Sequence, residues 1–186
     1  MTDRDETPEP ITVLIREHDA CRAQLARAAG DRSSGEGALA SALELLSYLE
    51  TALETHIAKE EGPLFSRLKA ALPASDRLID EMVAEHDLIR IKRDDVQAVL
   101  MELLGGHDDI RAERQALRSA LADPGRPTQV SAQLAVAIET VATKLRVHFE
   151  NEEDLVFPLA PDLLSEADLA AVMREMAAID GTETAP

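Results

Sequence analysis

The sequence predicts an all-α fold: an antiparallel, up-down-up-down four-helix bundle with an additional C-terminal helix. Aromatic residues make up only 2% of the 186 residues, and no stretch shows the alternating β-branched pattern of a strand. Ala and Leu, which favour helices, dominate the hydrophobic residues. Four long segments carry apolar residues at helical spacing, and an antiparallel bundle is the simplest arrangement that buries all of them.

Apolar periodicity, together with residues that start or stop helices, predicts five helices. In order, they span residues 10–29, 38–61, 75–104, 128–156 and 165–178. A proline suits the first turn of the first helix, and the Gly/Ser-rich loop at 30–37 ends it. Pro63 lacks the N–H that a helix interior needs, so it should kink or stop the second helix near Glu61. One or two further turns are expected before Pro73.

The later helices carry their own signals. Ser-Asp at 75–76 starts the third helix, and Gly-Gly at 105–106 ends it. Residues 107–127 are expected to form a connector with one short helix. Ser165 with Asp168 resembles the capped start of the last helix, which Gly181 should close. The predicted organisation is a disordered tail, a bundle and a terminal helix with its tail, at residues 1–10, 11–160 and 161–186.

Charge and cysteine content narrow the possible partners. The net charge of −17 argues against nucleic acid and against an anionic membrane surface. Cys21 is the only cysteine, so it excludes an internal disulfide and thiolate clusters and is expected in the core. No apolar run approaches eighteen residues and no leader pattern is found, so a cytoplasmic protein without a membrane partner is expected.

An internal repeat contains four of the five histidines. The triplet EHD occurs at 17–19 and again at 85–87, and each copy is followed by a longer motif, HIAKEEGPLF at 56–65 and HFENEEDLVF at 148–157. Acidic residues are 36 of 186, so one histidine with an acid four places on is expected by chance. Two such pairs, each preceded by EHD and each continuing with a second Glu and a Phe, are much harder to obtain by chance.

The spacing suits a metal centre. Residues four apart on a helix are rotated by about 40° and lie about 6 Å apart along the axis, so both point from one face. Six candidate ligands follow: His18, His56, Glu60, His86, His148 and Glu152. Four imidazoles and two carboxylates suit two ions, each with two histidines, and such N/O sites favour Fe, Mn or Zn over Cu(I). The Glu-x-x-His motif of ferritin-like proteins is missing, which disfavours that family.

At these residues the chain resembles the hemerythrin-like (HHE cation-binding) family, whose motif is H…HxxxE…H…HxxxE on a four-helix bundle. The match runs from about Ile11 to Leu159. The resemblance implies a centre of two non-haem iron ions, bridged by Glu60, by Glu152 and by an oxo or hydroxo group. Mn and Zn are the less favoured ions.

Two departures bear on function. Oxygen-carrying hemerythrins have a second histidine four residues from the first on the third helix, where this chain has Met82 and Arg90. Their fourth helix carries HxxxxD, where this chain has HxxxE flanked by Asn151 and Glu153. A more symmetric site with an open position on each iron is expected, which disfavours reversible oxygen carriage. The chain also lacks the cysteine-bearing N-terminal domain of the iron–sulfur repair members, which disfavours that role.

Residues beside the ligands have alternative interpretations. Glu17 and Glu85 either accept the second N–H of a ligand histidine from a neighbouring helix or lie on a solvated edge. Tyr48, two turns before His56, is either a packed tyrosine or a donor beside the site. The second Glu of each long motif, at 61 and 153, is expected at the surface. His107 is expected in an exposed loop, and the three phenylalanines are expected in the core.

Three functions remain open from the sequence. The leading one is a di-iron protein that binds or reacts with oxygen, peroxide or nitric oxide at a site of four histidines and two glutamates. No residue is identified as a proton donor, so enzymatic activity stays an open question. The second is an iron store, or an iron or oxygen sensor, that acts on a partner through the acidic surface or the terminal helix. The third is a metal-free interaction bundle.

Overall fold

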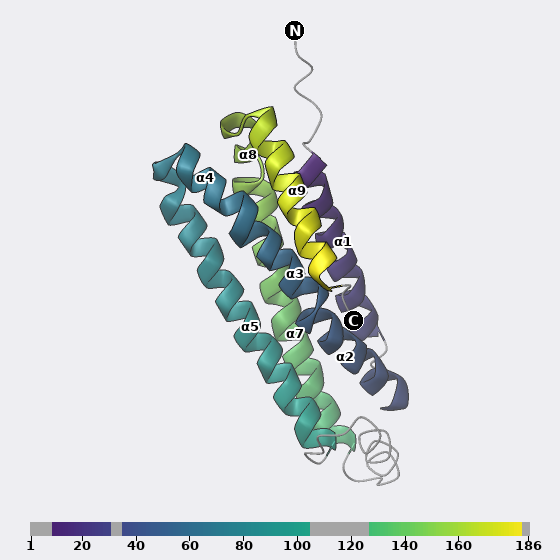
Figure 1. Ribbon diagram of the computed structural model, residues 1–186. Helices are drawn as coiled ribbons and strands as arrows, with labels where there is room; N and C mark the ends of the chain where they lie inside the picture. Colours follow the sequence, from purple (N-terminus) through teal and green to yellow (C-terminus); the bar gives the residue numbers. More distant parts are fainter. Residues whose placement is uncertain (1–8, 31–34, 105–126, 184–186) are drawn as a thin grey trace. The chain divides into compact units, whose positions relative to one another are not determined.

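The computed structural model describes residues 9–30, 35–104 and 127–183, and these ranges contain helices and turns but no strand. The elements are α1 Glu9–Gly30, α2 Gly35–Glu50, α3 Ala52–Lys59, η1 Glu60–Leu64, α4 Phe65–Ala71, η2 Pro73–Ser75, α5 Asp76–Leu104, α7 Pro127–Asn151, η3 Glu152–Val156, α8 Leu159–Leu163 and α9 Glu166–Glu183 (Figure 1). The all-α prediction is confirmed. Most of the expected tail (1–10) and connector (107–127) lies outside the described residues.

The chain divides into two compact units. The first comprises residues 1–21, 51–87 and 146–186, and the second comprises residues 22–50 and 88–145. Helices α1, α5 and α7 each contribute one end to each unit. The candidate ligands of the sequence analysis all belong to the first unit.

The first unit has an apolar core built from its helices. Helix α9 packs against α3 and η1, while α8 packs against α4 and η3. The buried side chains of this core include Leu14, Leu64, Phe65, Leu68, Ile79, Met82, Val156, Phe157, Val172 and Met176. Their burial removes apolar surface from water, which is the main favourable term in folding.

In the second unit the buried residues follow helical spacing. Helix α2 buries Leu39, Ala42, Leu45, Leu46 and Leu49, and α7 buries Leu134, Ile138 and Val141. This is the i, i+3, i+4 pattern of a helix with one apolar face. None of the described helices is long and apolar enough to cross a membrane.

Four local features differ from the expectation. At Pro63, where a kink or a stop was expected, the helix does not stop: the chain continues through a π-helical segment, η1, directly into α4. The second expected helix is interrupted at Thr51 instead. Helix α8 was not predicted, and α9 runs past Gly181 to Glu183.

The predicted cap of α9 is confirmed: the Asp168 N–H donates to Ser165 Oγ (3.2 Å), and the Ser165 N–H donates to Asp168 Oδ2 (3.2 Å).

Candidate metal centre

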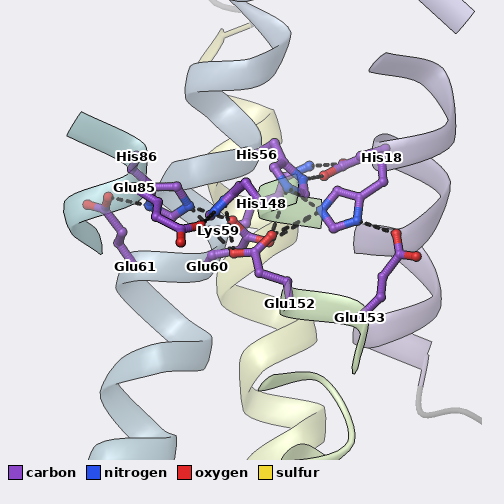
Figure 2. A network of polar contacts seen from close by, with 11 residues as sticks. His18, His56, Lys59, Glu60, Glu61, Glu85, His86, His148, Glu152 and Glu153 are labelled. Atoms are coloured by element: carbon purple, nitrogen blue, oxygen red, sulfur yellow. Dashed lines mark hydrogen bonds and ion pairs between the residues drawn. The ribbon is translucent and has the colours of Figure 1, made fainter. Parts of the chain in front are cut away.

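The four repeat histidines and the two glutamates predicted as ligands meet in the first unit (Figure 2). All six are buried, with at most 3% of each residue exposed. They form two groups, His18 and His56 with both glutamates, and His86 and His148 with both glutamates. Within each group, the ligand atoms lie within 4.8 Å of one another. Both glutamates therefore belong to both groups.

Glu60 directs one oxygen toward each histidine pair. Its Oε1 lies 3.1 Å from His56 Nε2 and 3.8 Å from His18 Nε2, whereas its Oε2 lies 3.3 Å from His86 Nε2. The position of Glu60 one helical turn after His56 produces the first of these distances. A carboxylate placed in this way can serve two cations at once.

Glu152 is arranged in the same way from the opposite repeat. Its Oε2 lies 3.3 Å from His18 Nε2, and its Oε1 lies 3.3 Å from His148 Nε2 and 3.6 Å from His86 Nε2. The two carboxylates thus have equivalent roles, as the internal repeat predicts.

A second layer of four carboxylates holds the other nitrogen of each of these four histidines. The Nδ1 contacts are His18 with Glu153 (2.7 Å), His56 with Glu17 (2.8 Å), His86 with Glu61 (2.8 Å) and His148 with Glu85 (2.9 Å). An Nδ1–H that donates to a carboxylate fixes the tautomer and orientation of the ring and raises the basicity of Nε2. All four Nε2 atoms are therefore presented to the interior of the site.

These contacts decide the alternatives for the neighbouring acids. Glu17 and Glu85 each accept from a candidate ligand histidine of another helix, which agrees with the first alternative. Glu61 and Glu153, which were expected at the surface, are about one-third exposed, and they also accept from His86 and His18. The repeated Glu-Glu pair was the available signal, since both copies of the motif carry it at the same place.

The outer layer is continued by Lys59 and Asn151. Lys59 is only 2% exposed, and its Nζ lies 2.5 Å from Glu17 Oε1 and 2.6 Å from Asp180 Oδ1 of α9. Asn151 Nδ2 donates to Glu85 Oε1 at 3.2 Å. The buried lysine was not singled out from the sequence, because an isolated lysine on a helix is usually exposed.

A π-turn follows each inner glutamate. The N–H of Phe65 donates to the carbonyl of Glu60, and the N–H of Phe157 donates to the carbonyl of Glu152 at 2.8 Å, both across five residues. In a regular α-helix, these partners would be turned about 140° from each other. The wider turn lets the glutamate and the phenylalanine both be buried. Such π-turns are frequent at functional sites.

The phenylalanine rings form an apolar wall beside the histidines, and all three are buried as predicted. Phe65 stacks on His86 with ring centroids 6.0 Å apart, and Phe157 stacks on His18 at 5.5 Å. Phe149 lies closest to a candidate ligand, with its ring centroid 3.9 Å from that of His18. Cys21 is also buried, as predicted.

The charges of the site attract cations strongly. Burial alone would lower the pKa of His56, but the attraction of Glu60 and the hydrogen bond to Glu17 raise it to about 10. Burial also opposes the charged form of His86, yet the close carboxylates of Glu152, Glu60 and Glu61 raise its pKa to about 11. Burial and the neighbouring Glu60 would raise the pKa of Glu152, but the close histidines lower it to about 2. Without metal, the site holds protons instead.

The polar atoms of the inner residues would be satisfied better by a metal ion than by one another. Both carboxylate oxygens of Glu60 and Glu152, and the Nε2 atoms of His86 and His148, are buried without a hydrogen-bond partner. Such groups are costly in a protein interior unless a cation satisfies them. Nitrogen and carboxylate donors at these positions suit Fe, Mn or Zn. The predicted ligand set is therefore brought together in a form that can hold metal.

Tyr48 is a half-buried residue of α2 in the second unit, so its suggested role beside the site stays a prediction. His107 lies outside the described residues.

No curated protein and no solved structure matches the chain. The family model described as hemerythrin HHE cation binding domain matches residues 9–160, which include all six candidate ligands. This match agrees with the resemblance found in the repeated histidine motifs and with a hemerythrin-like helical fold. The chain therefore belongs to the hemerythrin HHE cation-binding domain family.

Proposed function

We propose that this protein holds two iron ions at the site of four histidines and two glutamates, and that its function is to bind or react with oxygen, peroxide or nitric oxide. The observation that carries the proposal is the placement of Glu60 and Glu152. Each directs one oxygen to each histidine pair, while all four oxygens are buried without a hydrogen-bond partner. Two cations, one at each pair, would satisfy all of them.

The donor set favours iron. Each position offers two imidazole nitrogens and carboxylate oxygens, a combination typical of non-haem iron sites with open positions. When bound, two irons would supply a redox-active centre able to bind or react with small oxygen or nitrogen species. The protein's own residues shape the site. The outer carboxylates orient the imidazoles, and Phe65, Phe149 and Phe157 keep the surroundings of the histidines apolar.

The first experiment is the metal content and absorption spectrum of protein expressed in iron-rich medium. We expect about two irons per chain and spectral changes when oxygen, peroxide or nitric oxide is added to the reduced protein. The His56→Ala/His148→Ala double variant should lose the iron. The matched control is His107→Ala, which changes the one histidine outside the repeat. A wild-type protein that takes up no Fe(II) anaerobically would overturn the proposal and favour a metal-free interaction bundle.

Iron sensing through α9 is a second candidate function. Asp180 of this helix pairs with Lys59, whose amino group also contacts Glu17, and Glu17 holds His56. A change at the metal position of His56 could thus reach α9 through three polar contacts. This candidate predicts metal-dependent stability of α9, which hydrogen exchange can measure.

A further inference from the structure

The two halves of the site match each other at the inner histidines, the inner glutamates and the outer carboxylates, but the residues that contact two of the outer carboxylates differ. Lys59 stands three residues after His56, and Asn151 stands three residues after His148. Lys59 contacts Glu17, the carboxylate that holds His56. Asn151 contacts Glu85, the carboxylate that holds His148. One half therefore places a cation where the other half places a neutral amide.

The charge of Lys59 is only weakly screened by its surroundings. Its side chain is 3% exposed, so solvent screens its charge weakly. Its other partner, Asp180, is 55% exposed and is therefore better screened. The two carboxylates that receive these contacts are similar to each other, with Glu17 28% and Glu85 35% exposed. The difference in charge around these two outer carboxylates thus comes mainly from Lys59.

This difference in charge changes how well His56 and His148 can bind a metal ion. A carboxylate that accepts the Nδ1–H makes an imidazole a better metal ligand. Lys59 draws electron density from Glu17, which weakens Glu17 as an acceptor and leaves His56 a poorer ligand than His148. A buried ammonium near His56 also repels a metal cation there, with little solvent to reduce the effect.

From this difference we infer that the two metal positions are inequivalent, and that the position formed by His86 and His148 binds a divalent cation before the position formed by His18 and His56. Lys59 acts as a positioning residue that sets this order through Glu17. The inference rests on the proposed metal-binding function, and the following experiment distinguishes the failure of one from the failure of the other.

The test is a titration with Zn(II) alone, followed by 15N NMR of histidine-labelled protein. The ring nitrogens report directly which imidazoles are ligated. Since two neighbouring cations repel each other in any such site, the informative sample is the one with a single equivalent of Zn(II). In this sample we expect His86 and His148 to be ligated in roughly tenfold excess over His18 and His56. Loss of an outer partner usually changes metal affinity by about 10–100-fold, and the expected ratio is at the low end of that range.

Two substitutions then test the cause. Lys59→Asn makes the first half match the second, and Lys59→Gln removes the charge while keeping a longer chain. Both should bring the two populations close to equal, and circular dichroism should establish that at least one variant is folded. The inference is overturned by equal filling in the wild type, by preferred filling at His18 and His56, or by an unchanged preference in the folded Lys59 variants. Absence of Zn(II) binding at every ratio would instead overturn the proposed function itself.

Discussion

The Nε2 atoms of His18 and His56 lie 3.0 Å apart, although both imidazoles already donate or share a proton at Nδ1 with a carboxylate. In two neutral rings with the proton on Nδ1, the Nε2 lone pairs would face each other in a buried space. An additional proton or a metal cation must therefore lie between or beside the two Nε2 atoms. Two nitrogen ligands at about 2.1 Å from one ion, at a right angle, are also about 3 Å apart. The separation is therefore one that a shared cation accounts for.

Removing Glu60 should affect both metal positions, whereas removing His56 should affect one. The reason is that Glu60 Oε1 lies near His56 and Oε2 lies near His86. We expect His56→Ala to reduce the metal content from about two to about one ion per chain, and Glu60→Ala to reduce it further. Metal analysis after anaerobic Fe(II) loading and desalting measures this, with the exposed Asp162→Asn as the control. A Glu60→Ala protein that retains one full equivalent would contradict the bridging role.

A rise in pH should lower the stability of the metal-free protein but increase the stabilisation that metal binding adds. The folded-state pKa values of His56 and His86 are raised from 6.5 to about 10 and about 11. Their stabilising contribution is therefore complete below about pH 6.5 and is lost as the pH rises through the folded pKa values. Metal ligation needs the deprotonated Nε2, so stabilisation by metal should grow as the pH rises.

Thermal unfolding followed by circular dichroism between about pH 6.5 and 9 tests this pair of trends. The melting temperature of metal-free protein should fall across the range, and the difference between the loaded and metal-free proteins should increase. The His56→Gln/His86→Gln variant is the control, because it lacks both titrating groups. A metal-free melting temperature that rises with pH in the wild type relative to this variant would contradict the sign.

The outer glutamates Glu61 and Glu153 should matter for metal affinity although neither belongs to the inner set. They accept from Nδ1 of His86 and His18 at 2.8 and 2.7 Å. Glu61→Gln and Glu153→Gln should each weaken metal binding about 10–100-fold, the usual cost of losing such a partner. Competition with a chelator of known affinity measures this, and the exposed Glu150→Gln serves as control. Unchanged affinity in both variants would mean that the outer contacts only pack the site.

The six inner residues could be predicted because their positions depend on local geometry. His56 and Glu60 must share a helix face once the helix is recognised, and the repeat then indicates the equivalent pair. The chain's composition and apolar spacing were also sufficient for the long helices, apart from the break at Thr51, the continuation past Pro63, the short helix α8 and the end of α9 at Glu183. These are properties of short stretches, which a sequence displays directly.

The outer layer could not be predicted in the same way, because its contacts join residues far apart in the chain. His18 and Glu153 are separated by 135 positions, and nothing in either neighbourhood specifies the other. The π-turns depend on a hydrogen bond across five residues, which the apolar pattern does not encode. Pro63 was therefore expected to kink or stop the helix, and Lys59 was not singled out.

Metal loading should slow amide exchange in α9, and Lys59 should be required for this effect. The amino group of Lys59 joins Asp180 of α9 to Glu17, which holds His56. Hydrogen exchange with mass spectrometry on metal-free and loaded protein measures the difference, which Lys59→Ala should abolish. The control is Arg67→Ala, which removes the 2.6 Å ion pair with Glu175 of α9. That variant should keep the metal-dependent difference; its loss there too would show a general loosening of the helix.

Phe149 should be the phenylalanine that most affects the stability of the site. It is 1% exposed, and its ring lies 3.9 Å from His18 at an interplanar angle of 20°. Truncation to Ala leaves a cavity beside a buried imidazole and should cost about 3–5 kcal/mol, with a smaller loss for Phe149→Leu. Urea unfolding of the metal-free proteins measures this. On the same helix, Val147 is 48% exposed, so Val147→Ala should stay within about 0.5 kcal/mol of the wild type. Equal effects at both positions would mean that the stacked ring adds no more than an exposed side chain does.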